Sequence, residues 1–114
     1  MRWSISYWRN PYGKSPVERY IDAIASREER AELLSLLKGV QENGTDAIGV
    51  GFRQIEGKLW EIKIRIRGNQ HRIFYVVLKG NEMLLLHAYL KKTQKAPTKE
   101  IKVAKQRMGT VTGG

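Results

Sequence analysis

Ionisable side chains alternate with apolar ones along residues 59–67, whose sequence is LWEIKIRIR. Successive side chains of an extended strand point to opposite faces, so this pattern places one row of each kind on each face of a sheet. The apolar row is Trp60, Ile62, Ile64 and Ile66, and the ionisable row is Glu61, Lys63, Arg65 and Arg67. One face of an antiparallel sheet often simply meets water, but a row with three cations also suits the binding of a polyanion.

Further groups suited to phosphate chemistry follow this strand. A turn is expected at residues 68–70, and the next strand opens with His71 and Arg72. Histidine is the side chain that titrates near neutral pH, and an arginine guanidinium presents a planar pair of donors to phosphate oxygens. The remaining candidates lie in the last predicted strand and the basic loop after it: His87, Tyr89, Lys91, Lys92 and Lys95.

The net charge of +10 is concentrated in one half of the chain. Residues 1–57 carry 8 Lys/Arg and 8 Asp/Glu, whereas residues 58–114 carry 13 basic groups against only Glu61, Glu82 and Glu100. A one-sided basic half in a small domain indicates nucleic acid or an acidic protein as the partner. A basic surface that serves only solubility is the alternative.

Composition excludes several classes of protein. With 114 residues and 41% hydrophobic content, the chain is expected to form one domain over residues 1–109, followed by a frayed tail over residues 110–114. It contains no cysteine, so disulfides and thiolate metal sites are excluded and a reducing cytoplasm is the expected location. Two histidines without a carboxylate cluster predict neither a metal centre nor a cofactor. No apolar run is long enough for a membrane span, and residues 1–6 lack the apolar core of a signal peptide.

Periodicity and turn residues predict the elements that position these groups. Alternation over residues 2–9 indicates a strand, and Ser15-Pro16-Val17-Glu18 has the form of a capping box that opens an amphipathic helix. A second capping sequence begins at Ser26 and opens a helix that stops at Asn43-Gly44. The glycines of residues 44–51 indicate a loop. Strands are expected at residues 52–55, 59–67, 72–78 and 83–90, and a final helix is expected from Pro97 to Gly109.

The predicted fold class is α+β. We expect an antiparallel sheet of four to five strands, backed by the two N-terminal helices as a helical hairpin and followed by the C-terminal helix. The core face of the last strand is expected to hold Leu84, Leu86, Ala88 and Leu90.

Several strings in this order of elements resemble the RelE superfamily of bacterial toxins, and in particular its HigB-type, phage-derived branch. Residues 59–63 (LWEIK) are similar to that branch's lwElR strand, with Lys63 where arginine is usual, and residues 71–75 (HRIFY) to its yRvfy strand. Residues 86–97 (LHAYLKKTQKAP) resemble its LhgFxKKtqktP segment, with Tyr89 where phenylalanine is common. The resemblance covers about residues 3–108, which is nearly the whole chain.

This resemblance implies a RelE-like fold and the function of a toxin in a type II toxin–antitoxin pair. Such enzymes cut messenger RNA in the translating ribosome without a metal, because the RNA's own 2′-hydroxyl attacks the adjacent phosphate. The products are a 2′,3′-cyclic phosphate and a 5′-hydroxyl. The implied partners are mRNA, the ribosome and an antitoxin with a helix-turn-helix DNA-binding domain. A non-catalytic protein of the same fold, whose basic face binds RNA or only its antitoxin, is the alternative.

The resemblance also suggests roles for individual side chains. The catalytic candidates are Lys63, Arg65, Arg72, His87 and Lys92, and the candidates for RNA binding are Arg67, His71, Tyr89, Lys91 and Lys95. Arg72 is expected to clamp the phosphate. Lys63 is expected to act as a base or as an electrostatic stabiliser, unless it only forms a salt-bridged ladder with Glu61. His87 is favoured over His71, which can be a simple turn residue, and Tyr89 or Trp60 is a candidate for stacking on a base.

Overall fold

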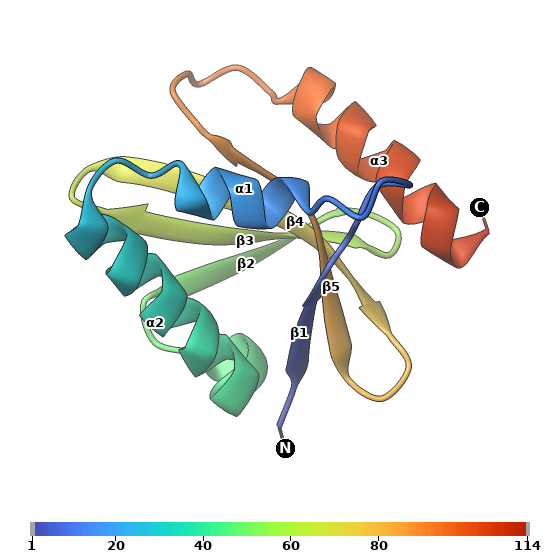
Figure 1. Ribbon diagram of the computed structural model, residues 1–114, viewed down its shortest axis with the longest axis horizontal. Helices are drawn as coiled ribbons and strands as arrows, with labels where there is room; N and C mark the ends of the chain where they lie inside the picture. Colours follow the sequence, from blue (N-terminus) through green and yellow to red (C-terminus); the bar gives the residue numbers. More distant parts are fainter. Residues whose placement is uncertain (1, 114) are drawn as a thin grey trace.

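The computed structural model describes residues 2–113, which form three α-helices and five strands (Figure 1). The strands are β1 (Ser4–Tyr7), β2 (Val50–Glu56), β3 (Leu59–Ile66), β4 (Asn69–Leu78) and β5 (Glu82–Leu90). The helices are α1 (Pro16–Asp22), α2 (Arg27–Asn43) and α3 (Thr98–Thr112), and a short 3-10 turn, Gly44–Asp46, follows α2. The fold is therefore mixed α+β with a C-terminal helix, as the sequence predicts.

The five described strands form one sheet in the order β1-β5-β4-β3-β2. Strands β2 to β5 make an antiparallel meander in which each strand pairs with the next along the chain. β1 differs, because it pairs with β5 in parallel, with Ser4 opposite Glu82 and Tyr7 opposite Leu85. The expectation of a purely antiparallel sheet is therefore wrong at this edge. Most of the chain lies between β1 and β5, so no hairpin constrains their relative direction.

Serine caps open the first two helices, as predicted. The Ser15 hydroxyl accepts a hydrogen bond at 3.2 Å from the backbone N–H three residues later, and the Ser26 hydroxyl does the same at 3.1 Å. Each bond satisfies one of the N–H groups that a helix start leaves unpaired. Gly44 ends α2 with φ 60°, and a Cβ at this position would lie 2.4 Å from the indole nitrogen of Trp3. Glycine therefore allows the segment before β1 to pass close to the end of α2.

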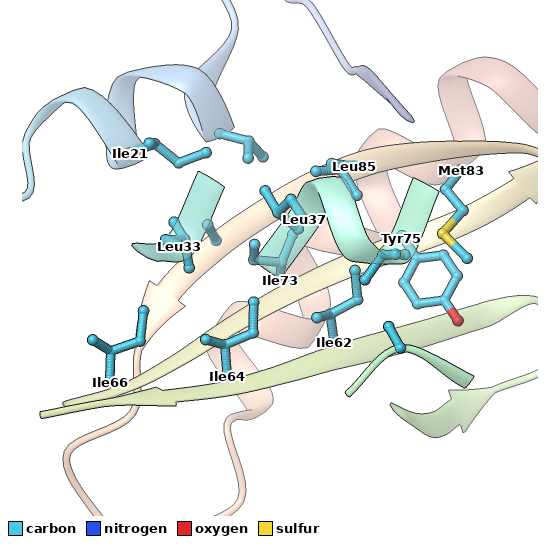
Figure 2. Packing of buried hydrophobic residues seen from close by; sticks show 14 residues of the cluster. Ile21, Leu33, Leu37, Ile62, Ile64, Ile66, Ile73, Tyr75, Met83 and Leu85 are labelled. Carbon is cyan, nitrogen blue, oxygen red and sulfur yellow. The ribbon is translucent and has the colours of Figure 1, made fainter. Parts of the chain in front are cut away.

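Helices α1 and α2 cover one face of the sheet (Figure 1). Figure 2 shows Ile62, Ile64 and Ile66 pointing from β3 toward Leu33 and Leu37 of α2. All five side chains are buried, so the apolar row of β3 lies in the core as predicted. The two helices pack against the sheet more than against each other, α1 mainly on β5 and α2 on β3. The expected helical hairpin is therefore not confirmed.

Helix α3 covers part of the opposite face (Figure 1). Its inward side chains are Ile101, Ala104 and Met108. They pack against a second cluster from the strands, in which Phe74 and Leu86 are fully buried. On the same face of β3, Lys63 and Arg65 stay exposed. One face of the sheet is thus closed by two helices, and the other is only partly closed by one.

The end of α3 differs from the prediction. Gly109 does not stop the helix, which continues to Thr112 and is capped by Gly113 with φ 75°. Thr110 helps to hold this last turn, because its hydroxyl accepts a hydrogen bond from the indole N–H of Trp8 at 2.8 Å. Residues 110–112, which were expected to lie in a frayed tail, therefore continue α3, and Gly114 lies outside the described residues.

A bulge in β5 changes which side chains face each core. Phe74 pairs with His87, but the next residue, Tyr75, pairs with Leu85, so Leu86 is an extra residue in β5. Leu86 consequently packs on the α3 side, whereas Leu85 is buried beneath α1 and α2. The prediction that Leu84, Leu86, Ala88 and Leu90 share one face is wrong, because the extra residue reverses the alternation before Ala88.

Candidate functional site

A cleft of about 320 Å³ opens on the face of the sheet opposite α1 and α2. Its floor comes from β2, β3 and β4, and its rim comes from residues 91–94 of the loop between β5 and α3. The lining residues are Arg53, Glu61, Lys63, Gln70, Arg72, Lys91, Lys92, Thr93 and Gln94. Five cations thus surround one carboxylate, which makes the cleft a site for an anion.

Arg72 is fixed on the floor of this cleft. In the register of the sheet it lies between Lys63 of β3 and Tyr89 of β5. Its side chain is 8% exposed, and Nη2 donates to Gln70 Oε1 at 2.7 Å. Its Nε lies 4.0 Å from Glu61 Oε1. A guanidinium held in this way loses little conformational freedom when its other donors bind a ligand.

Glu61 is the buried carboxylate of the cleft, with 1% of its surface exposed. Its Oε2 accepts a hydrogen bond from the Tyr89 hydroxyl at 3.2 Å, and Nη2 of Arg53 lies 3.3 Å from Oε1. Arg53 and Arg72 both approach Oε1 within ion-pair distance, yet neither makes a hydrogen bond to it. Burial chiefly raises the pKa of Tyr89 and the charge of Glu61 adds to it, so the phenol stays protonated. Glu61 therefore holds its two arginines by charge.

Lys63 is exposed and lines the cleft directly opposite Arg72. Within residues 2–113 it forms no ion pair, because the nearest carboxylate, Glu61, pairs with arginines instead. The alternative of a Lys63–Glu61 ladder is therefore wrong. Arg65 is exposed on the same face, two residues farther along β3, and does not line the cleft.

The loop after β5 brings the predicted lysines to the cleft. Lys91 donates from its backbone N–H to the Gln70 carbonyl at 2.9 Å and from Nζ to the Lys95 carbonyl at 3.2 Å. The first bond holds the loop against the start of β4, and the second lies within the loop. Lys92 is exposed and lines the cleft, and Lys95 is exposed and lines an adjoining hollow of about 550 Å³. Three lysines from one loop therefore lie in or beside the site.

His71 does not belong to this site. It lies on the opposite face of β4 from Arg72 and is 3% exposed. Its Nε2 lies 2.6 Å from Glu29 Oε2, and its Nδ1 lies 2.7 Å from the Tyr20 hydroxyl. His71 therefore joins α1, α2 and β4 in the interior, and its role in RNA binding stays a prediction that this cleft does not support.

The position of the β3–β4 turn explains why His71 lies in the interior. The turn is Arg67-Gly68 rather than residues 68–70, and this difference pairs His71 with Ile64 of the core row. Arg67 adopts φ 51° in the turn and does not continue the ionisable row of β3. A hydrogen bond to His71 chiefly lowers the pKa of Glu29, and the charge of Arg67 is a smaller contribution. Arg67 therefore lies in the β3–β4 turn and does not line the cleft.

His87 shares a face with Tyr89 but lies beneath α3. Its Nε2 is 2.7 Å from Glu100 Oε1, and Nη1 of Arg107 is 3.3 Å from its Nδ1. Its ring stacks with those of Phe74 and Tyr89. Burial chiefly lowers the pKa of His87, against the hydrogen bond to Glu100. His87 therefore lies on the same face as Tyr89, but α3 covers it and it does not line the cleft.

Sequence reasoning missed several parts of the site. The lining residues that it did not propose as site residues are Arg53, Glu61, Gln70, Thr93 and Gln94. Arg53 could have been found, because counting outward from the predicted turn at residues 56–58 pairs it with Glu61, as observed. Sequence reasoning also missed two carboxylate–histidine pairs, Glu29–His71 and Glu100–His87. The partners of each pair lie far apart in the sequence, so no local motif indicates them. Neither pair lines the cleft.

The cleft can bind and neutralise a phosphate diester. Arg72 and Arg53 supply guanidinium donors on its floor, and Lys63 and Lys92 supply exposed amines above them. Across residues 2–113, no group of three or more His, Cys, Asp or Glu side chains is placed to hold a metal ion. None of the helices formed by these residues is long and apolar enough to cross a membrane.

The family model described as "Phage derived protein Gp49-like (DUF891)" matches residues 20–109. This range runs from α1 into α3 and contains every residue that lines the cleft. No curated protein matches the chain.

Proposed function

The chain belongs to the Gp49-like family of phage-derived proteins, and we propose that it is the toxin of a type II toxin–antitoxin pair, a HigB-type member of the RelE superfamily. We propose that it cuts mRNA in translating ribosomes. The observation that carries this proposal is the cationic cleft around Arg72, which is complementary to the phosphates of RNA. The three strings that resemble this branch, residues 59–63, 71–75 and 86–97, include most of the lining of the cleft.

In the proposed reaction the RNA supplies its own nucleophile. The 2′-oxygen bonds to phosphorus as the bond from phosphorus to the 5′-oxygen breaks. The 2′-hydroxyl proton passes to a base and the 5′-oxygen takes up a proton, which leaves a 2′,3′-cyclic phosphate and a 5′-hydroxyl. Arg72, oriented by Gln70, is suited to the non-bridging oxygens on which negative charge increases. Lys63 faces Arg72 across the register, so it can reach the same phosphate as a base or as a stabilising cation.

The acid–base groups of the cleft support dependence on the ribosome. Both carboxylate–histidine pairs of residues 2–113 lie outside the cleft, and the one carboxylate that lines it, Glu61, is buried against Tyr89 and two arginines. Proton transfer there is therefore left to amines, which are weak bases at neutral pH. Alignment of a hydroxyl with a phosphate can by itself supply several kcal/mol of a reaction barrier. We therefore propose that the ribosome orients the mRNA and that this protein supplies the charges.

The proposed partner is an antitoxin with a helix-turn-helix domain, whose acidic segments would pair with the basic half of the chain. Such an association is fast and sensitive to salt. The second candidate function is a non-catalytic protein of the same fold, which binds RNA or only the antitoxin. The burial of Arg72 favours it, because a guanidinium that is 8% exposed also contributes to the fold.

Induced expression in a bacterial host tests the toxin. We expect wild type to arrest growth and the Arg72→Ala and Lys92→Ala variants to lose the arrest. Arg72→Lys is compared with Arg72→Ala, because lysine keeps the charge but loses the two-pronged donor. Lys79→Ala is the control, since Lys79 is exposed in the β4–β5 turn and lies outside the cleft. Urea unfolding verifies that each variant is folded. Unchanged arrest by folded cleft variants would remove the active site from this cleft.

A comparison of one transcript with and without translating ribosomes tests the reaction. We expect slow or undetectable cutting of the naked transcript and fast cutting when it is translated. The 2′,3′-cyclic ends of the products identify the chemistry. Equal rates and identical cut sites under both conditions would indicate a self-sufficient ribonuclease, and no cutting under either would favour the non-catalytic binder.

A further inference from the structure

Two further hollows continue the cleft toward α3. The first, of about 550 Å³, shares Arg53, Lys91 and Gln94 with the cleft. The second, of about 570 Å³, shares Ile55 and Ile101 with the first. They form one trough that leaves the cleft between strand β2 and helix α3. We name it the α3 trough, and its principal residues are Arg53, Ile55, Lys95, Ile101, Lys102 and Lys105.

Cations line the rims of the α3 trough. Lys95 comes from the loop, and Lys102 and Lys105 lie three residues apart on α3, so they point to the same side of the helix. The lining contains a single carboxylate, that of Glu56, whose Oε2 lies 2.7 Å from Lys105 Nζ. The two side chains of this pair are 64% and 47% exposed, and exposed ion pairs contribute little to stability. An anion from outside can therefore replace Glu56 at Lys105.

The floor of the α3 trough is apolar. Ile55 and Ile101 form it, and no aromatic side chain is among the residues of the described chain that line it. Because β2 is the edge strand, no further strand of the sheet closes the trough on its outer side. A row of cations beside an apolar floor suits a single nucleic-acid strand that is held mainly by its phosphates.

We propose that the α3 trough carries the single-stranded RNA on one side of the phosphate bound at Arg72, with successive phosphates at Lys95, Lys102 and Lys105. This inference rests on the proposed function of the cleft and adds a second region of contact to it. An acidic protein segment is the other polyanion of the right charge. Continuity with the cleft favours RNA, since one strand fills both without a break.

Fluorescence anisotropy with two labelled oligouridine strands tests the proposal. One strand has about 3 nucleotides and can fill only the cleft, and the other has about 12 nucleotides and can also reach the trough. We expect the Lys102→Ala/Lys105→Ala variant to bind the longer strand about tenfold more weakly at low salt, with a salt dependence smaller by about one unit of slope. Its affinity for the short strand is expected to equal that of wild type. The matched control is Lys38→Ala/Lys79→Ala, which removes two exposed lysines outside the cleft and the trough.

The outcomes separate the trough from the cleft. Equal binding of the longer strand by the trough variant and wild type would overturn the inference, as would an equal loss in the control variant. Arg72→Ala is expected to weaken binding of both lengths, and if it weakens neither, the function proposed for the cleft fails instead. A polyglutamate peptide of matched length is expected not to displace the RNA. Displacement at equal concentration would assign the trough to an acidic protein segment and overturn the inference.

Discussion

The two faces of the sheet each bury one glutamate, but the two carboxylates have different partners. On the face closed by α1 and α2, Glu29 accepts hydrogen bonds from Asn69 at 3.0 and 3.1 Å and contacts His71 Nε2 at 2.6 Å. On the partly open face, Glu61 accepts one hydrogen bond from Tyr89, and two arginines approach its other oxygen without hydrogen bonding to it.

The contacts of Glu29 and Glu61 differ in whether they depend on the orientation of the donor groups. The hydrogen bonds to Glu29 depend on the orientation of their donors, so they fix α2 against β4 and allow little rearrangement. The attraction between Glu61 and its arginines involves no hydrogen bond to Oε1, so it leaves the donors of Arg53 and Arg72 available to another anion while Gln70 keeps Arg72 in place. The first carboxylate therefore stabilises the fold, and the second keeps two cations in place for a ligand.

Removal of the first carboxylate is expected to have the largest effect on stability. Glu29→Ala leaves the buried imidazole of His71 without its partner and the exposed amide of Asn69 without its acceptor, which costs about 3 kcal/mol. The free energy of unfolding in urea measures this loss. Glu29→Gln, which keeps one acceptor oxygen, is expected to lose less. A loss below about 1 kcal/mol for Glu29→Ala would contradict the structural role.

Neutralisation of the second carboxylate is expected to separate stability, binding and catalysis. Glu61→Gln leaves Arg53 and Arg72 without their counter-ion, so stability falls by about 1–2 kcal/mol. Because a negative charge leaves the cleft, the affinity for a short RNA strand is expected to rise a few-fold. Cleavage in a translating extract is expected to fall, since Arg72 is less well oriented. A parallel loss of affinity and cleavage would show that Glu61 only supports the fold.

The histidine beneath α3 is expected to make stability depend modestly on pH. Burial and the charge of Arg107 lower the pKa of His87 more than Glu100 raises it, so the unfolded chain takes up this proton first as pH falls. Stability should therefore decrease as pH drops through about 6.5, the ordinary pKa of histidine, by less than about 1 kcal/mol. Urea unfolding at about pH 7.5 and about pH 5.5 measures this decrease in stability. His87→Gln should reduce it, and an unchanged difference would exclude His87 as its source.

The smallest expected effect lies at the end of α3. Trp8→Phe removes the hydrogen bond from the indole to Thr110 and weakens the contact of the ring with the Arg107 guanidinium, which lies 4.9 Å from the ring centroid. The expected loss is about 0.5–1 kcal/mol, seen as a fall of a few degrees in Tm. Thr110→Val removes only the hydrogen bond and should show a smaller fall. An unchanged Tm in both variants would contradict the packing of residues 110–112 against Trp8.

Local patterns in the sequence predict much of this fold. The alternation in residues 59–66 correctly separates the core row of β3 from its polar row, because burial of one face requires a period of two. The capping sequences at Ser15 and Ser26 correctly locate the starts of α1 and α2, since their hydroxyls bond to amides three residues away. Lys63, Arg72 and Lys92, which the family resemblance suggested as catalytic candidates, come from three segments and line one cleft.

The errors arise where one residue changes the register. The turn lies at Arg67-Gly68, before the centre of the predicted turn at residues 68–70, and this register pairs His71 with Ile64 of the core row. The extra residue Leu86 has a similar effect in β5, and no local signal in the sequence indicates that bulge. The pairing of Glu100 with His87 depends on where α3 packs, which is decided by its apolar side and not by the charged residues themselves.

The parallel pairing of β1 with β5 affects the order in which a newly made chain can fold. The first strand cannot join the sheet until residues 82–85 have emerged from the ribosome. Pairing of two strands so far apart in the sequence is slow, because closing the long loop between them costs entropy before the stabilising contacts form. The rim of the cleft, residues 91–94, emerges later still. A ribosome that synthesises this chain therefore carries only an incomplete meander, without its first strand or a finished cleft, through most of translation.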